Sequence, residues 1–481
     1  MKLEKIIANT EVLEIVGNKD IEVKDLSTDS NSVTAGSLFI CLNGKDYDGH
    51  SFISQVERYG AVAVICEKKL ETSLTQIIVR NSRKAMSIAA ANFFGNPDRK
   101  MKLIGVTGTN GKTTTTHLIT SILMRAGVKC GLIGTLGTFY ADTYLEPSLT
   151  TPDPIVLHKT LADMYEKGVE TVIMEISAHA VYLDKVSGLR FEIAVFTNLS
   201  HDHLDFFGTM ENYKRAKLKF FRENECKYVV TNSDDATGRE ISGIIKQALS
   251  YGIDNPADVF AIKIKEKTYG TDFVLNLFDC IYNIKLSLIG RFNVYNALAA
   301  ATVSALYGIP TEKVAEGLED LKGVSGRLES VYSGDYTVYI DYAHTPDGLE
   351  KTLTALRPVC CGRLICVFGC GGNRDEKKRR VMGAISGKLA DFTVITTDNP
   401  RFEDPMDIIW EIEKGVLEKS RNYVIVQDRA EAIKYALSSA AKGDVVLVAG
   451  KGSEKYQDIF GIKHLYNDKD TIEEILRGKN K

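Results

Sequence analysis

Short apolar runs alternate with helical patterns through the middle of the chain. Residues 101–107 form an apolar run typical of a strand, and apolar residues at helical spacing then predict a helix over residues 112–126, with Gly127 at its C-terminal cap. Further strand-like runs cover residues 129–135, 169–177, 192–198 and 227–232, and residues 293–308 form a helical pattern. Because strands that alternate with helices pair in parallel, we expect a parallel sheet.

Similar patterns lie on both sides of this middle segment. Strand-like runs at 36–42, 61–67 and 75–80 precede a Gly/Pro break at 93–100, and a polar, glycine-bearing stretch at 321–331 precedes the last segment. The last segment has strand-like runs at 337–343, 363–369, 392–398, 423–428 and 444–450, separated by helical patterns. This order predicts an α/β protein with a second doubly wound unit and with domains at residues 1–97, 98–324 and 325–481.

Composition narrows the class of protein. The 481 residues carry 60 Lys and Arg against 63 Asp and Glu, a net charge of -3, which excludes the basic surface of a nucleic-acid-binding or anionic-membrane-binding protein. No apolar run approaches the ~18 residues that a membrane span needs, and Glu and Asp interrupt the N-terminal apolar residues, unlike in a signal peptide. The odd count of 9 cysteines suits a reducing compartment, so we expect a cytoplasmic protein.

The sequence GVTGTNGKTTTT at residues 105–116 is the first candidate for chemistry. A Walker A pattern would have glycine where Val106 stands, yet the strand, glycine loop and helix are the arrangement that such a motif requires. Gly108 and Gly111 permit a tight turn, Lys112 can reach phosphates, and Thr113 can hold Mg²⁺. The alternative is a Gly/Thr-rich turn before a surface helix.

Other candidates follow the predicted strands. Glu175 ends one strand, as an Mg²⁺-binding acid would. The next strand leads to a loop with His201, Asp202, His203 and Asp205, which partly matches a zinc hydrolase signature, although Phe206 stands where a further histidine belongs. The alternative for this loop is a set of turn and cap residues.

A basic run follows that loop. Lys214, Arg215, Lys217 and Lys219 lie close together on a predicted helix, and such a run is usually a solvated face.

The last segment offers a glycine loop and an Asp–Arg pair. Gly369, Gly371 and Gly372 precede a helix, but Arg374 stands where a dinucleotide fingerprint has its third glycine, which leaves an NAD-dependent dehydrogenase as a weak alternative. Asp398 and Arg401 could hold the amino and carboxylate ends of an amino acid, or could belong to an Asn-Pro turn.

Together these segments resemble the Mur ligase family, ATP-dependent ligases that assemble the peptide stem of peptidoglycan. The matching motifs are GTNGKTTTT, TDSNSVTAGSLFICLNGKDYDGH, LTTPDP, MEISAHA, TNLSHDHLDFFGTMENYKRAK, GRFNVYNALAA, DYAHTPDGLE, FGCGGNRDEKKR, TDNPRFEDP and AGKGSEKYQ. The chain is most similar to members that add the third residue of the stem. The resemblance implies a UDP-sugar-binding domain, a P-loop central parallel-sheet domain that binds ATP, and a C-terminal Rossmann-like domain.

The resemblance also implies site residues. The ATP site would comprise Gly108, Thr109, Asn110, Gly111, Lys112, Thr113, Thr114, Asn293, Asn296, Arg327 and Asp341. Lys112, Glu175, His203 and Lys217 would be catalytic, and Thr113, Glu175, His203 and a carbamylated Lys217 would bind two Mg²⁺ ions. The UDP-sugar peptide would contact Ser30, Lys45, Asp46, Tyr47, Thr150, Thr151, Ser177 and Lys185. The incoming amino acid would contact Arg374, Asp398, Asn399, Pro400, Arg401, Gly450 and Glu454.

The implied reaction joins meso-diaminopimelate to UDP-N-acetylmuramoyl-L-alanyl-D-glutamate through an acyl phosphate, in a monomer that binds no nucleic acid and inserts into no membrane. Departures from the family pattern occur at Asn31, Leu149, Leu183, Lys185 and Ser453. Ser453 stands in place of a histidine, which leaves L-lysine or a near analogue such as lanthionine open as the amino acid. A folylpolyglutamate synthetase-like ligase and a nucleotide-binding protein without catalytic activity are further alternatives.

Overall fold

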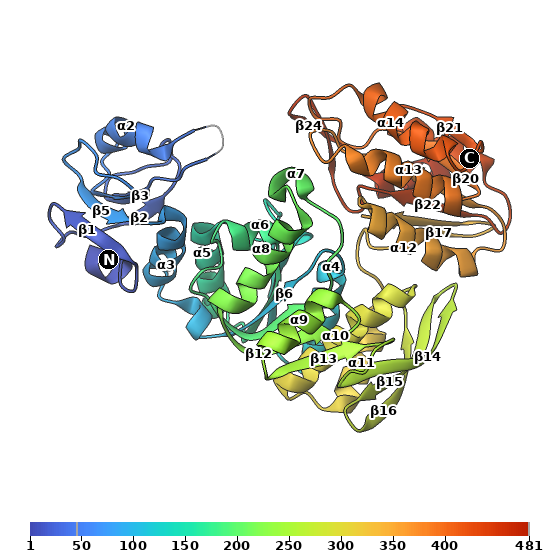
Figure 1. Ribbon diagram of the computed structural model, residues 1–481, viewed down its shortest axis with the longest axis horizontal. Coiled ribbons are helices and arrows are strands. Elements are labelled where there is room, and N and C mark those ends of the chain that lie inside the picture. The colour runs from blue at the N-terminus through green and yellow to red at the C-terminus, as the bar shows by residue number, and fades with distance from the viewer. Residues whose placement is uncertain (45–46, 480–481) are drawn as a thin grey trace. The chain divides into compact units, whose positions relative to one another are not determined.

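The computed structural model describes residues 1–44 and 47–479 (Figure 1). The chain forms two compact units: unit 1 comprises Met1–Thr107, Gly127–Val195 and Arg215–Val229, and unit 2 comprises Gly108–Ala126, Phe196–Lys214 and Val230–Lys481. The domain boundaries expected after residues 97 and 324 stay predictions. Among the helices of the described residues, none has both the length and the apolar character that a membrane crossing requires.

The N-terminal sheet belongs to unit 1 and has the strand order β1-β5-β4-β3-β2, in which only the β1–β5 pair is antiparallel. Leu38 and Ile40 pack on one face with α1 and α3, whereas Phe39 and Cys41 pack on the other with α2. The alternation along β3 thus buries both faces of the sheet. The elements are α1 (Leu3–Ile6), β1 (Val12–Val16), β2 (Asp25–Ser27), β3 (Ser37–Ile40), η1 (Gly49–Phe52), α2 (Ile53–Arg58), β4 (Ala63–Cys66), β5 (Thr75–Val79), α3 (Ser82–Phe93) and η2 (Pro97–Arg99).

The central sheet has the strand order β16-β15-β14-β13-β12-β11-β6-β10-β7-β8-β9. In unit 1, β10 pairs in parallel with β6 and with β7, which confirms the predicted parallel sheet. The antiparallel hairpins at its two ends, β7–β8–β9 and β14–β15–β16, were not predicted. The elements are β6 (Lys102–Thr107), α4 (Lys112–Arg125), β7 (Cys130–Gly134), β8 (Gly137–Tyr140), β9 (Thr143–Leu145), α5 (Pro154–Glu166), β10 (Thr171–Ile176), α6 (Ala178–Tyr182), β11 (Arg190–Phe196), α7 (Leu204–Phe207), α8 (Met210–Glu223), β12 (Glu225–Asn232), α9 (Ala236–Ile244), β13 (Ala248–Gly252), β14 (Val259–Lys267), β15 (Gly270–Leu277), β16 (Cys280–Leu286), α10 (Arg291–Tyr307) and α11 (Thr311–Asp320).

The C-terminal sheet lies in unit 2, with the order β17-β18-β22-β19-β20-β21 and only β17 antiparallel to its neighbour. Cys366 and Phe368 pack with α12 to α14 on one face, and Ile365 and Val367 pack with α15 and α16 on the other. In Figure 1, α13 lies beside α14. Helices on both faces confirm the predicted doubly wound unit. The elements are β17 (Glu329–Ser333), β18 (Thr337–Asp341), α12 (Pro346–Leu356), η3 (Arg357–Val359), β19 (Leu364–Phe368), α13 (Lys377–Leu389), β20 (Phe392–Ile395), α14 (Pro405–Leu417), β21 (Tyr423–Ile425), α15 (Arg429–Ser439), β22 (Val445–Ala449), β23 (Tyr456–Ile459), β24 (Ile462–Leu465) and α16 (Asp468–Lys479).

A buried ion pair fastens α16 to this sheet. The Arg429 Nε and Nη2 atoms each donate to an oxygen of Asp468 at 2.8 Å, and both side chains are 0% exposed. Arg429 Nη2 also donates to the Ala449 carbonyl oxygen at 2.9 Å, at the end of β22. Because an ion without its partner is costly inside a protein, this pair should be needed for folding of the C-terminal region.

We expect Asp468→Ala to lower the free energy of unfolding by about 3–5 kcal/mol, because Arg429 would remain buried without its carboxylate. Urea unfolding of the full chain, followed by circular dichroism, measures the effect. Asp470→Ala, at an exposed position on the same helix, serves as the control. Equal effects of the two substitutions would contradict the role given to the ion pair.

Candidate functional site

The loop between β6 and α4 has a backbone that requires glycine at two positions. Gly108 has a φ of +151° and Gly111 a φ of +86°. A Cβ atom at Gly108 would lie 1.8 Å from the Thr197 Oγ1 atom, and one at Gly111 would lie 2.4 Å from the Asn296 Oδ1 atom. Because α4 begins directly after Gly111, the loop ends at a helix N-terminus, whose backbone N–H groups favour an anion.

Lys112 is held close to the backbone of this loop. Its Nζ atom donates to the carbonyl oxygens of Gly108 and Thr109, both at 2.9 Å. The loop itself is anchored where the Asn110 N–H donates to Asn198 Oδ1 at 3.0 Å. An ammonium group therefore lies beside a glycine loop that can bind an anion, as the sequence predicts.

Two buried asparagines of α10 connect to α4. Thr115 Oγ1 donates to Asn296 Oδ1 at 3.3 Å, Asn296 Nδ2 donates to Asn293 Oδ1 at 2.9 Å, and Asn293 Nδ2 donates to the Ile289 carbonyl oxygen at 2.8 Å. The structure thus brings Asn293 and Asn296, which were expected near the nucleotide, to the helix that follows the phosphate loop.

Arg327 also reaches the phosphate loop. Its Nη2 atom donates to Thr113 Oγ1 at 3.0 Å, and its guanidinium carbon lies 4.4 Å from the ring centroid of Tyr342. Nearby, Asp341 accepts hydrogen bonds from the backbone N–H groups of Leu328 and Ala343 at 2.6 and 2.9 Å. Burial raises the pKa of the Asp341 carboxyl group, although the charge of Arg327 opposes this shift. Arg327 and Asp341 thus lie close together in unit 2, and their expected contact with ATP stays a prediction.

The loop after β11 is stabilised by charge. His203 has a φ of +54°, and its Nε2 atom lies 3.3 Å from Asp202 Oδ2. Burial by itself would raise the pKa of Asp202, but the positive charges of His203, His344 and Lys378 outweigh it and hold this pKa below its usual value. The loop therefore keeps a buried carboxylate next to His203.

Side chains of this loop contact the segment before α13. Across residues 1–44 and 47–479, no group of three or more His, Cys, Asp and Glu side chains is placed to hold a metal ion. His201 and Asp205 instead lie 3.8 and 3.6 Å from Asp375 and Arg374, which belong to the segment before α13.

In unit 1, Glu175 is buried at the carboxyl end of β10. It is 1% exposed, and its two oxygens accept hydrogen bonds from the Thr135 N–H and Oγ1 groups at 2.9 and 3.1 Å. Thr135 was not predicted, although its place at the end of a predicted strand was a usable signal. A carboxylate is thus oriented by a neighbouring strand.

Residues expected to bind the UDP-sugar peptide lie around Glu175. Thr150 Oγ1 lies 3.1 Å from Thr135 Oγ1, and Thr151 Oγ1 donates to the Glu175 carbonyl oxygen at 2.8 Å. The Ser177 N–H donates to Thr151 Oγ1 at 3.0 Å. Unit 1 therefore brings Thr150, Thr151 and Ser177 to the predicted catalytic acid.

The other predicted contacts of the UDP-sugar peptide are dispersed in unit 1. Ser30 is buried, whereas Tyr47 is exposed. Lys45 and Asp46 lie outside the described residues. Lys185 Nζ forms an ion pair with Asp153 Oδ1 at 2.8 Å, so this cation faces the segment that follows Thr150 and Thr151.

The lysines of the basic run on α8 differ in how deeply they are buried. Lys217 is 1% exposed, whereas Lys214 is 28% exposed and pairs with Glu240. The solvated-face interpretation is therefore wrong for Lys217. A fully buried lysine needs a special environment or a chemical modification.

At the carboxyl ends of β20 and β22, the predicted amino-acid contacts form a connected group. Asn399 Nδ2 donates to Glu454 Oε2 at 2.9 Å, and Lys451 Nζ donates to both Asn399 Oδ1 and Glu454 Oε2 at 3.0 Å. Asp398 Oδ2 is buried without a hydrogen-bond partner among the described residues, and a Cβ atom at Gly450 would lie 2.7 Å from it. Lys451, which is 0% exposed, was missed, although a lysine between two glycines at a strand end could have indicated it.

Arg401 and Arg374 flank one glycine. A Cβ atom at Gly371 would lie 3.0 Å from Arg401 Nη1 and 3.9 Å from Arg374 Cγ. Arg401 has a φ of +52°, and its Nη1 atom donates to the Gly372 carbonyl oxygen at 2.6 Å. Arg401 and Arg374 thus both lie beside the glycine loop that precedes α13.

Known protein families match most of the chain. The Mur ligase middle domain matches residues 106–304, the glutamate ligase domain of Mur ligases matches residues 326–452, and the Mur ligase family catalytic domain matches residues 22–101.

Individual proteins match over their full length. A UDP-N-acetylmuramoyl-L-alanyl-D-glutamate--2,6-diaminopimelate ligase of Clostridium acetobutylicum is 43% identical over 99% of both chains. A solved structure of a ligase with the same activity in its name is 30% identical, with a TM-score of 0.72, and the match covers 100% of this chain and 99% of the other. MurF ligase from Thermotoga maritima in complex with ADP shares the fold, with a TM-score of 0.65, 22% identity and coverage of 95% and 98%.

These full-length matches agree with the predicted α/β fold, and they replace the dehydrogenase and zinc hydrolase interpretations. The chain belongs to the Mur ligase family.

Proposed function

We propose that this protein is an ATP-dependent ligase that adds meso-diaminopimelate to UDP-N-acetylmuramoyl-L-alanyl-D-glutamate in peptidoglycan precursor synthesis. The observation that carries the proposal is the 43% identity, over 99% of both chains, to a ligase with that name. The loop around Lys112 supports the use of ATP, and the group around Asp398 supports an amino-acid substrate. We further propose that the enzyme works as a cytoplasmic monomer.

The two Mg²⁺ ions that the family implies would be held by Thr113, Glu175, His203 and Lys217. Thr113 and Glu175 offer hydroxyl and carboxylate oxygens, which are the ligands that Mg²⁺ prefers, and His203 would add an imidazole nitrogen. The ammonium group of Lys217 would repel the ions, whereas a carbamate formed from its amine and CO₂ would attract them. When bound, the ions would neutralise phosphate charge.

The reaction proposed is activation of a carboxylate followed by attack of an amine. The D-glutamyl side-chain carboxylate takes the γ-phosphoryl group of ATP, and ADP leaves. The amine of diaminopimelate then attacks the acyl phosphate, a tetrahedral intermediate forms, and phosphate leaves. Lys112 would stabilise the transferring phosphoryl group, and Thr150, Thr151, Ser177 and Lys185 would orient the UDP-sugar peptide.

The ammonium and carboxylate groups of the incoming amino acid indicate two kinds of contact with the protein. The unpartnered oxygen of Asp398 can accept a hydrogen bond from an ammonium group, and Arg401 and Arg374 can bind carboxylates. Diaminopimelate carries a second carboxylate that lysine lacks, which favours it at a site with two guanidinium groups. Lanthionine carries the same charged ends and remains the alternative because of Ser453.

The proposal is tested by phosphate release from ATP with the UDP-dipeptide and a panel of amino acids. Release that depends on both the UDP-dipeptide and diaminopimelate is expected. Release with a folate substrate in place of the UDP-dipeptide would favour a folylpolyglutamate synthetase-like ligase, and no turnover with any substrate would favour a nucleotide-binding protein without catalytic activity.

We expect Lys112→Ala to reduce kcat by about a hundredfold or more, because a lost contact to the developing phosphoryl charge costs about 3 kcal/mol in the barrier. Circular dichroism should show a normal fold. Lys159→Ala, at an exposed position, is the control. Near-normal turnover of Lys112→Ala would mean that this loop is not the ATP site.

Lys217→Ala should abolish nearly all activity if the lysine is carbamylated. Added bicarbonate should fail to restore turnover, whereas a short carboxylic acid such as acetate should restore part of it by occupying the vacated space. Lys214→Ala, on the same helix, should retain activity. Normal turnover of Lys217→Ala would remove this lysine from the catalytic residues.

For the amino acid, we expect a strong preference for meso-diaminopimelate over L-lysine. Arg401→Ala should raise the KM for diaminopimelate by about thirtyfold, which corresponds to a lost contact of about 2 kcal/mol, and should leave the KM for ATP unchanged. Arg380→Ala, at an exposed arginine, is the control. Equal use of lysine by the wild type would contradict the role of the arginines.

A further inference from the structure

The loop after α6 carries a buried carboxylate whose hydrogen bonds reach α3 and α8. Asp184 is 6% exposed. Its Oδ2 atom accepts from Asn81 Nδ2 at 2.9 Å, and its Oδ1 atom accepts from Lys219 Nζ at 2.7 Å and from Ser187 Oγ at 3.1 Å. One side chain thus joins the start of α3, the middle of α8 and its own loop.

Further side chains hold the same loop on both sides. Ser87 Oγ, from α3, donates to the carbonyl oxygens of Lys185 and Ser187 at 3.3 and 2.8 Å. Asn224 Nδ2, directly after α8, donates to the Val186 carbonyl oxygen at 2.6 Å. The backbone on both sides of Lys185 is therefore fixed by α3 and by the end of α8.

Asp184 also adopts a backbone conformation that favours glycine. Its φ is +56°, in the left-handed region. A residue held there normally owes its place to the surrounding structure. Here the gain is a carboxylate that accepts from three partners, which glycine could not provide.

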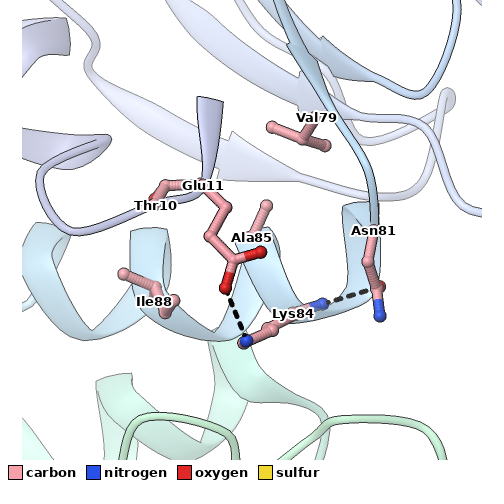
Figure 2. Close-up of a pocket in the computed structure, with 7 residues that line it drawn as sticks. All are labelled: Thr10, Glu11, Val79, Asn81, Lys84, Ala85 and Ile88. Atoms are coloured by element: carbon pink, nitrogen blue, oxygen red, sulfur yellow. Dashed lines mark hydrogen bonds and ion pairs between the residues drawn. The ribbon is translucent and has the colours of Figure 1, made fainter. Parts of the chain in front are cut away.

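The Asn81 side chain uses its amide nitrogen, and not its amide oxygen, for the hydrogen bond to Asp184. Its Oδ1 atom caps α3 by accepting from the backbone N–H groups of Arg83 and Lys84, both at 3.0 Å. Figure 2 shows Asn81 and Lys84 lining a small pocket in which Lys84 Nζ meets Glu11 Oε1 at 2.9 Å. The cap and the Asp184 contact therefore use different atoms of one side chain, so they can be separated by mutation.

Lys219 links Asp184 to α8, and this link restrains how the helix is turned about its axis. Lys217 and Lys219 are two positions apart on this helix, so their side chains point in different directions. Because Lys219 is tied to Asp184, the rotation of α8 about its axis is restrained, and this rotation decides where Lys217 points. Asp184 also directly precedes Lys185 in the chain.

We propose that Asp184 is a positioning residue that aligns Lys185 with the UDP-sugar peptide and Lys217 with the reacting phosphoryl group. The inference rests on the proposed function. It assigns Asp184 no contact with substrate. Its effect is transmitted through Lys219 and through the backbone of the loop.

The test is the kinetics of Asp184→Asn, which keeps the size of the side chain and tolerates a positive φ. We expect the KM for the UDP-dipeptide to rise about tenfold and kcat to fall about tenfold, with unchanged KM values for ATP and diaminopimelate. Lys219→Met should reproduce the fall in kcat, and Lys219→Arg should restore most of it. Asn81→Ser, which retains a cap for α3 but not the donor to Asp184, should raise the KM for the UDP-dipeptide.

The control is Asp444→Asn. Asp444 is a buried carboxylate that accepts from the backbone N–H groups of Arg363 and Ala441 at 2.7 and 2.9 Å, at the start of β22. Its substitution should lower the thermal midpoint without changing KM or kcat. If Asp184→Asn lowers only the midpoint, or if the two variants change the kinetic parameters alike, Asp184 is merely structural.

Hydrogen exchange separates this inference from the proposed function. An inactive wild type in the ligase assay would overturn the proposed function. Asp184→Asn is still expected to speed exchange in residues 183–189 and 210–223 of the full chain, relative to wild type. Unchanged exchange in both segments would overturn the positioning role.

Discussion

The close approach of Thr197 and Asn296 to the phosphate loop excludes a Cβ atom at Gly108 and at Gly111. Thr197 Oγ1 uses this proximity to donate to the Asn110 carbonyl oxygen at 2.6 Å. Contacts within the protein therefore hold the loop, and the position of the Lys112 ammonium group follows from the loop carbonyls that it contacts. Ordering a long lysine side chain costs conformational entropy, and the two hydrogen bonds of Lys112 to the loop carbonyls offset part of that cost.

Buried cations recur in the molecule, and each one needs compensation. Arg429 has the carboxylate of Asp468, and Lys451 has Glu454 together with the amide oxygen of Asn399. The second pair lies among the predicted amino-acid contacts, where the charge of Lys451 orients the side chains of Asn399 and Glu454. For Lys217, the proposed carbamate would replace a buried positive charge with a negative one.

Local features of the site could be predicted from the sequence, whereas features created by tertiary packing could not. The glycine loop, the start of α4 and the strand-end position of Glu175 depend on residues close in sequence, and the pattern identified them. Lys217 and Lys214 differ in burial although they share a helix and a charge, because packing by distant segments decides which face is covered. Thr135 supports Glu175 across forty residues of chain, and such a contact leaves no periodic signal. The edge hairpins were missed because their strands follow one another without an intervening helix.

The β23–β24 hairpin is bound to the predicted amino-acid contacts through its backbone. The Asp458 N–H donates to Asn399 Oδ1 at 2.9 Å, the Arg401 N–H donates to the Asp458 carbonyl oxygen at 3.0 Å, and the Phe460 N–H donates to the Arg401 carbonyl oxygen at 2.7 Å. The hairpin's outer side chains, such as Ile462 and Leu465, are exposed. Under the role proposed for Arg401, exchanges in this hairpin that shift the Arg401 backbone by fractions of an ångström would retune amino-acid selection, while every residue proposed to touch the ligand stays the same. Comparison of contact residues alone would then overlook the origin of a changed preference among ligases of this kind.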